Sequence, residues 1–161
     1  MAIEKVREYF RKYGMEEQIR EFDVSSATVA LAAQALQCEP ARIAKSLSFL
    51  VDEQAVLIVM AGDAKVDNVR YKALFHCTAK MLHPEQVEEM IGHAIGGVCP
   101  FGIKEGVRVY LDESLKRFKT VFPACGSSNS AIELTIPKLE KYAAPCEWID
   151  ICKDWQAETQ D

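Results

Sequence analysis

Apolar residues recur along the chain with the spacings of both helices and strands. Helical spacing predicts an amphipathic helix over residues 3–13 and a second, almost wholly apolar helix that ends near Gln37. Alternation predicts a strand over 43–51, and a continuous apolar run predicts a central strand over 55–61. Weaker patterns predict further helices and strands: helices over 67–75, from Pro84 and over 137–142, a helical turn over 112–117, and strands over 18–22, 79–82, 107–111, 119–123, 131–135 and 147–151.

These helices and strands do not alternate as they do in parallel α/β folds, so the pattern favours an α+β fold with a mixed or antiparallel sheet. The length of 161 residues suits one domain, which we place at residues 1–152, followed by a polar tail over 153–161. We find no export signal and no apolar run of the ~18 residues that a membrane helix needs. The six scattered cysteines then indicate reduced thiols and a cytoplasmic protein.

The net charge of −5 disfavours a long nucleic-acid duplex as partner, because such partners are bound by basic surfaces. Most of this charge lies in residues 139–161, which hold six acidic and two basic side chains. The rest of the chain is close to neutral and is compatible with binding one short end of an RNA. We therefore expect neither DNA nor a membrane as partner.

Lys45 interrupts the apolar pattern of the strand over 43–51. It shares parity with Ile43, Leu47 and Phe49, so its side chain is expected on their face of the strand. Burial of an unpaired charge costs several kcal/mol, which favours a cation directed into a cleft that binds an anionic or carbonyl-bearing ligand. A lysine on an edge strand, whose ammonium reaches water along its own methylenes, fits the same pattern.

Two loops carry residues suited to ligand binding. In GHAIGGVCPFG (92–102), Gly96 and Gly97 let a ligand approach main-chain amides, which can stabilise an oxyanion. A tight connection between a helix and a strand would use the same residues. The loop PACGSSNSAIEL (123–134) offers small hydroxyls and an amide, which suit either a polar ligand or a turn.

In this order, IAKSLSF, AGDAKVD, GGVCPFG and CGSSNSAIEL resemble the YbaK/prolyl-tRNA-synthetase-associated editing domains over about residues 20–145. The resemblance implies a mixed, partly barrel-like β-sheet flanked by helices. It implies a trans-acting deacylase that hydrolyses the ester of a mischarged tRNA, typically tRNA for proline carrying a small amino acid such as alanine or cysteine. The aminoacylated 3′ end of tRNA would be the partner, with prolyl-tRNA synthetase as a candidate second partner and neither a metal nor another cofactor required.

By that resemblance Lys45 contacts the terminal phosphate or sugar and helps to place the ester carbonyl. The backbone of Gly96 and Gly97 would hold the carbonyl or the attacking group. In the loop over 123–134, Gly126 matches a glycine of the family. Some members carry a histidine a few residues after it, where this chain has serines and an asparagine, which leaves the amino-acid specificity open. One methylene is worth ~1–3 kcal/mol, so we expect a small pocket that excludes proline. Substrate contacts are expected from Val29, Leu47, Met60, Asp63, Cys99, Pro100, Gly126, Ser127 and Asn129.

Three alternatives stay open at this stage. Cys99, with His93 in the same loop, could form a thiol hydrolase or redox site. His76, Cys77 and His83 could bind a metal, although their spacing matches no familiar zinc site. The fold could also bind an RNA end or a synthetase without catalysing a reaction.

Overall fold

The computed structural model of the protein describes residues 2–155. Its α-helices are α1 (Ala2–Arg11), α2 (Val29–Leu36), α3 (Asn68–Phe75), α4 (Pro84–Ile91) and α5 (Ile136–Ala143). Its 3-10 helices are η1 (Glu16–Gln18), η2 (Pro40–Arg42) and η3 (Glu113–Arg117). Its strands are β1 (Arg20–Glu21), β2 (Ile43–Val51), β3 (Gln54–Ala61), β4 (Lys65–Val66), β5 (Arg108–Asp112), β6 (Thr120–Pro123), β7 (Ser130–Ala131), β8 (Leu134–Thr135), β9 (Glu147–Ile149) and β10 (Cys152–Lys153).

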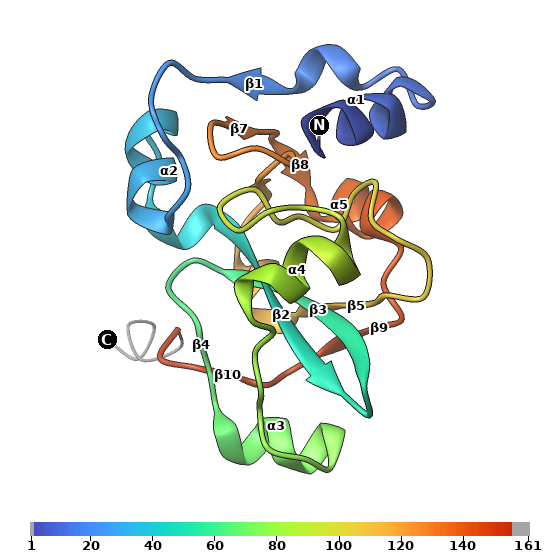
Figure 1. The fold of residues 1–161 in the computed structure, drawn as a ribbon. Coiled ribbons are helices and arrows are strands. Elements are labelled where there is room, and N and C mark those ends of the chain that lie inside the picture. The colour runs from blue at the N-terminus through green and yellow to red at the C-terminus, as the bar shows by residue number, and fades with distance from the viewer. Residues whose placement is uncertain (1, 156–161) are drawn as a thin grey trace, which may run out of the picture.

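One mixed sheet in the order β8-β6-β2-β3-β5-β9 curls into a half-barrel at the centre of the molecule (Figure 1). Its central pair is the antiparallel hairpin of β2 and β3, in which Lys45 lies opposite Met60. β6 adds to β2 in parallel, and β5 adds to β3 in parallel. The predicted α+β fold with a mixed, partly barrel-like sheet flanked by helices is therefore confirmed.

Helices cover both faces of the central hairpin. On one face, Val87 and Ile91 of α4 form a cluster that includes Leu50 of β2. On the other face, Tyr71 of α3 packs on Phe49 with ring centroids 5.2 Å apart. Because strand residues alternate, the even-numbered residues of β2 face α4, and the odd-numbered residues face α3.

The predicted elements agree with the structure apart from details of the short ones. The segment 79–82 makes a single bridge to β2, between Phe49 and Met81, instead of a strand. The predicted strand over 131–135 is split into β7 and β8, and the last predicted strand ends at Ile149. The two-residue pairing of β4 with β10 was missed, because two residues are too few for a period to show.

The C-terminal segment is folded further than the sequence suggests. Lys153 belongs to β10 and lies opposite Lys65, and the indole Nε1 of Trp155 donates to the carbonyl of Cys152 at 3.2 Å. The remainder of the predicted tail, residues 156–161, lies outside the described residues. Within residues 2–155, none of the helices has both the length and the apolar character required to cross a membrane.

Candidate functional site

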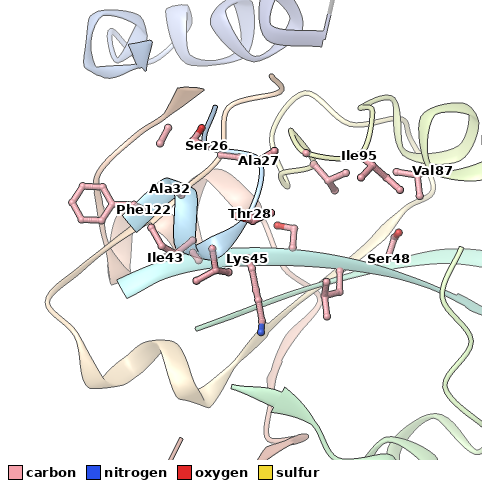
Figure 2. Close-up of a pocket in the computed structure, with 18 of the residues that line it drawn as sticks. Ser26, Ala27, Thr28, Ala32, Ile43, Lys45, Ser48, Val87, Ile95 and Phe122 are labelled. Carbon is pink, nitrogen blue, oxygen red and sulfur yellow. The ribbon is translucent and has the colours of Figure 1, made fainter. Parts of the chain in front are cut away.

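A cavity of about 280 Å³ lies beside β2, between the start of α2, the loop after α4 and the loop after β6 (Figure 2). Most of its walls are small or aliphatic side chains, such as Ala32, Ala124 and Ala131. Hydroxyl groups interrupt the apolar surface at five positions: Ser26, Thr28, Ser46, Ser48 and Ser130. An apolar hollow with a few polar groups is the usual form of a small-ligand site.

The cavity lies where one edge of β2 lacks a neighbouring strand. β3 pairs with the first edge along almost all of β2. In the described part of the chain, the second edge is paired with β6 at residues 43–44, and the segment 80–82 bonds to the backbone of Ser48 and Leu50. Between these contacts, residues 45–47 leave the second edge open to the cavity.

Ser46 presents its backbone to this open edge. The carbonyl of Ser48 and the amide of Leu50 both point to the second edge, where they bond to Leu82 and Lys80. Backbone groups repeat their direction every second residue along an antiparallel strand, so the N–H and C=O of Ser46 point the same way. The Ser46 hydroxyl is also buried, and no residue in the described part of the chain forms a hydrogen bond with it. The N–H and C=O of Ser46 therefore face the open edge, and its hydroxyl lies buried beside them.

The beginning of α2 forms another wall of the cavity. Thr28 caps the helix, because its hydroxyl accepts a hydrogen bond from the amide of Leu31 at 3.2 Å. Ala27, Thr28 and Val29 all line the cavity. The positive end of the helix dipole therefore lies at this wall, where it favours a negative or developing negative charge.

The loop with Gly96 and Gly97 borders the cavity from the opposite side. Gly96 has φ of +98°, and a side chain there would lie 3.3 Å from the Cβ of Ala27. Gly97 packs on backbone, since a Cβ would lie 2.6 Å from the carbonyl carbon of Gly126. The amide of Gly97 already donates to the carbonyl of Ala94 at 3.1 Å. Gly96 lines the cavity, whereas Gly97 holds two loops together.

The loop over 123–134 forms hydrogen bonds with the segment that leads into α2. The Asn129 side chain donates to the carbonyl of Phe22 at 2.9 Å, and the Phe22 amide donates to the Asn129 carbonyl at 2.8 Å. The hydroxyls of Ser127 and Ser130 lie 2.6 Å apart. The structure thus engages Ser127 and Asn129 within the protein, and places Ser130 at the cavity wall.

Lys45 leaves β2 on the opposite face from Ser48 (Figure 2). Its Nζ donates to the carbonyl of Gly62 at 3.2 Å, and its half-buried side chain lines the cavity around the open edge. Burial lowers the pKa of Lys45 below its ordinary value of 10.5, and the charge of Asp63 acts in the opposite direction. The ammonium is therefore directed to the face of β2 that turns away from α4 and the glycine loop, where it bonds to Gly62.

The structure brings together four of the residues predicted from the sequence at the cavity: Lys45, Val29, Leu47 and Gly96. It places Met60 in the core, fully buried on β3, where its sulfur accepts the thiol hydrogen of Cys152 at 3.5 Å. It pairs Asp63 with Arg117. The other predicted residues lie outside the cavity wall: Gly97, Cys99, Pro100, Gly126, Ser127 and Asn129.

Cys99 and His93 form a buried pair behind the glycine loop. The Cys99 sulfur lies 3.5 Å from His93 Nε2, which also lies 2.8 Å from the carbonyl of Phe101. Burial raises the pKa of the Cys99 thiol to about 12, and burial lowers the pKa of His93. Both groups are therefore neutral at physiological pH and closed to substrate, which argues against a thiolate nucleophile.

The histidines considered as metal ligands have structural roles. His76 ends α3 in the left-handed conformation, and His83 precedes the first turn of α4. Across residues 2–155, no three His, Cys, Asp or Glu side chains gather closely enough to hold a metal ion.

The serine hydroxyls that line the cavity were not predicted from the sequence. Ser46 and Ser48 face α4 from a strand that is otherwise largely buried, and this pair of polar residues on one face was a usable signal. Ser26 and Ser130 carry no such signal, because both lie in turn-like sequence and become wall residues only through the packing of distant loops.

Known proteins resemble this chain in sequence and fold. The model of the aminoacyl-tRNA editing domain family matches residues 23–142. YwhH of Bacillus subtilis (strain 168), described as uncharacterized, is 52% identical over 157 residues, which span 97% of this chain and 100% of YwhH. A proline–tRNA ligase of Geobacillus sp. (strain WCH70) is 30% identical over 102 residues, or 63% of this chain and 18% of the ligase. A crystal structure described as a candidate trans-editing enzyme for prolyl-tRNA synthetase superposes with a TM-score of 0.85 and 28% identity, over 95% of this chain and 98% of that one.

Proposed function

Because the chain belongs to the aminoacyl-tRNA editing domain family, we propose that it is a trans-acting deacylase that hydrolyses the ester of a mischarged tRNA. The observation that carries the proposal is the cavity at the open edge of β2, where free backbone and hydroxyl groups meet a lysine. The cavity would receive the aminoacyl group, and Lys45 would contact the phosphate or sugar of the terminal nucleotide.

The reaction needs little chemical help from side chains. An aminoacyl ester is already activated, so a positioned water and stabilisation of the developing oxyanion can supply most of the rate increase. Water adds to the ester carbonyl, the C–O bond to the ribose breaks, and the proton of the water passes to the departing ribose oxygen. Free amino acid and uncharged tRNA are the products.

The groups around the cavity suit these tasks. The outward N–H of Ser46 and the positive end of α2 can stabilise negative charge on the carbonyl oxygen. The outward C=O of Ser46 can accept a hydrogen bond from the α-ammonium group of the amino acid. We assign the Ser46 backbone and the Gly96 loop to holding the ester, and Lys45 to holding the RNA.

The favoured substrate is tRNA for proline charged with a small amino acid such as alanine or cysteine. The alanines and valines of the wall leave a modest space, and discrimination by size alone is worth ~1–3 kcal/mol per methylene. The likeness to part of a proline–tRNA ligase supports the same tRNA, and makes prolyl-tRNA synthetase a candidate partner. A cytoplasmic location follows from this substrate.

A panel of charged tRNAs tests the proposal. Release of free amino acid is followed from tRNA for proline charged with alanine, cysteine, serine or proline, with the wild-type protein and with Lys45→Ala. We expect hydrolysis of at least one small amino acid, sparing of prolyl-tRNA, and strong loss of hydrolysis in Lys45→Ala. Ester half-lives that equal those without protein for every pairing would contradict deacylation, and would favour a non-catalytic RNA-binding function.

A further inference from the structure

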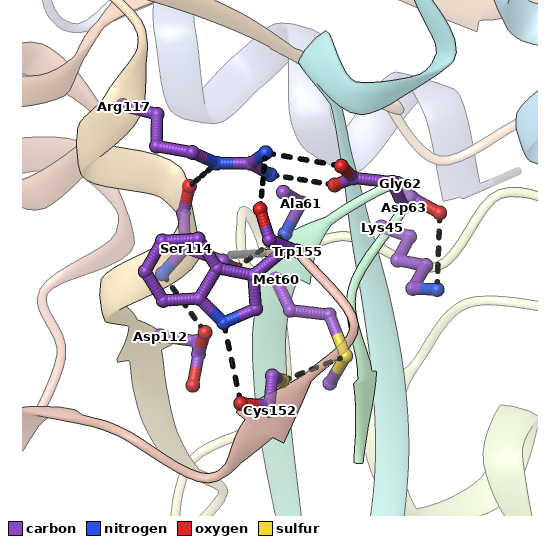
Figure 3. Close-up of polar contacts among 10 residues, drawn as sticks. All are labelled: Lys45, Met60, Ala61, Gly62, Asp63, Asp112, Ser114, Arg117, Cys152 and Trp155. Atoms are coloured by element: carbon purple, nitrogen blue, oxygen red, sulfur yellow. Dashed lines mark hydrogen bonds and ion pairs between the residues drawn. The ribbon is translucent and has the colours of Figure 1, made fainter. Parts of the chain in front are cut away.

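A chain of polar contacts runs from Lys45 to the C-terminal segment (Figure 3). Lys45 bonds to the carbonyl of Gly62, and the next residue, Asp63, is paired with Arg117. Arg117 Nη2 lies 2.5 Å from Asp63 Oδ1, and Nη1 lies 3.0 Å from Oδ2. Two parallel hydrogen bonds of this kind fix the direction of the carboxylate as well as its position.

Arg117 is itself held at several points. Its Nε donates to the carbonyl of Ser114 at 3.0 Å, and its Nη1 donates to the carbonyl of Trp155 at 3.2 Å. The guanidinium also stacks over the Trp155 ring, 5.0 Å from the ring centroid. Trp155 lies beyond residues 23–142, which match the family model, so this support comes from a separate part of the chain.

The turn that carries the Gly62 carbonyl is closely packed. The amide of Ala61 donates to the hydroxyl of Ser114 at 3.1 Å. At Gly62 there is no room for a side chain, since a Cβ would lie 2.1 Å from the carbonyl oxygen of Pro40 and 2.8 Å from Val29 Cγ1. The hydrogen-bond acceptor of Lys45, the carbonyl of Gly62, is therefore neutral and held in place by its surroundings.

The charge of Asp63 raises the pKa of Lys45, and the charge of Lys65 lowers it. The Cys152 thiol lies in the same environment, and burial raises its pKa, so it is neutral near neutral pH. A carboxylate released from Arg117 would be free to pair with Lys45, which bonds to the carbonyl of the preceding residue, Gly62, and a half-buried ion pair is stronger than one in water. Such a pair would compete with an anionic ligand for the ammonium.

We propose that Arg117 is a positioning residue that keeps Asp63 away from Lys45, so that the ammonium remains free for the anionic RNA end. The inference rests on the proposed function for its purpose, but the state of Lys45 can be measured without tRNA. The same arrangement explains why Asp63, expected to contact substrate, is engaged within the protein.

Chemical acylation of Lys45 tests the inference directly. Wild-type protein, Arg117→Ala, Asp63→Ala and the double variant are treated with an acylating reagent at one pH, and modification of Lys45 is followed by peptide mass spectrometry. In Arg117→Ala the released carboxylate should slow the reaction about three- to tenfold, as a pKa rise of about half a unit to one unit would. In the double variant the rate should return to that of Asp63→Ala.

A matched control removes another arginine that contacts the C-terminal segment. Arg70 pairs with Asp150 at 3.2 Å and donates to the carbonyl of Cys152 at 3.0 Å, without contacting Asp63. Arg70→Ala should leave acylation of Lys45 unchanged. Thermal unfolding of each variant is recorded in parallel, and Arg117→Lys, which keeps a cation beside Asp63, should show a smaller slowing if Arg117→Ala does not fold.

Two results would overturn the inference. One is unchanged acylation of Lys45 in Arg117→Ala, and the other is equal slowing in Arg117→Ala and in the double variant, which a general structural role would give. Deacylation is then measured on the same proteins, with loss expected in Arg117→Ala and recovery in the double variant. If wild-type protein hydrolyses no charged tRNA, the proposed function fails while the acylation result still decides the role of Arg117.

Discussion

The two faces of β2 differ in how their polar groups are satisfied. On the face towards α4, the Ser46 hydroxyl is buried without a partner beside an open strand edge. On the other face, Lys45, Asp63 and Arg117 form a connected network that extends to Trp155. On this second face the Tyr71 hydroxyl is also buried without a partner in residues 2–155, but it lies in the core and not at the cavity wall. Unsatisfied buried groups cost stability, so the one at the cavity wall indicates a ligand site, whereas the network around Lys45 indicates a support.

Removal of the lysine should have the largest effect on activity. Lys45→Ala deletes the cation that we assign to the RNA end, and we expect deacylation to fall by about 100-fold or more, as for loss of a charge-stabilising group. Single-turnover hydrolysis of a small-amino-acid ester on tRNA for proline measures the loss, with thermal unfolding as the control for folding. Retention of more than half of the activity would remove Lys45 from the mechanism.

The cavity face depends on two loops that pack backbone against backbone. Gly97→Ala would place a Cβ 2.6 Å from Gly126, so one loop must shift. We expect a loss of about 2–4 kcal/mol in the free energy of unfolding, together with loss of deacylation.

A matched glycine separates packing from backbone strain. Gly106 has φ of +90° and nothing within 4 Å of its Cβ position, so Gly106→Ala should cost only about 1 kcal/mol, from strain. Denaturant unfolding compares the two variants. Equal losses would show that the contact between the loops is unimportant.

Ser46→Ala should reduce deacylation without lowering the stability of the protein. The hydroxyl has no partner within residues 2–155, so its removal should leave the free energy of unfolding unchanged or slightly higher. Loss of a hydrogen bond to the substrate should reduce deacylation about tenfold. A clear loss of stability with full activity would reverse the assignment of the two faces.

Cys99→Ala should have the smallest effect. The thiol is buried behind the glycine loop, and burial raises its pKa to about 12. Activity should stay within about twofold of wild type, because only a small buried side chain is removed. Complete loss of deacylation in a folded variant would restore the thiol mechanism.

The sequence predicts the fold better than it predicts the site. Long periodic segments such as β2 and β3 can be predicted as strands, because many residues along each segment show the same burial pattern. The motifs also lead to Lys45 and Gly96, which both line the cavity. The two-residue strands β4 and β10 lack such repetition.

The missed parts of the site depend on contacts between distant residues. Ser46 faces the cavity because β6 pairs with β2 only at residues 43–44 and leaves the next part of that edge uncovered. No local sequence pattern predicts how far the two strands pair. Asp63 stands in a segment that resembles the family, yet its partner Arg117 lies 54 positions away. Loop residues such as Asn129 show hydrogen-bonding capacity in the sequence, but the structure decides whether a ligand or Phe22 uses it.

The most direct measurement is a titration with a non-hydrolysable analogue of alanyl-adenosine, in which an amide replaces the ester at the 3′ position. Binding is monitored by the chemical-shift changes of backbone amides in NMR spectra. If the open edge of β2 binds the aminoacyl end of tRNA, the largest shifts will fall on Ser46, Gly96 and the first turn of α2. A second hollow, between α3 and β9, is lined by residues such as Leu74 and Trp148. Shifts confined to that hollow, or the absence of any saturable shift, would contradict the site described for this protein.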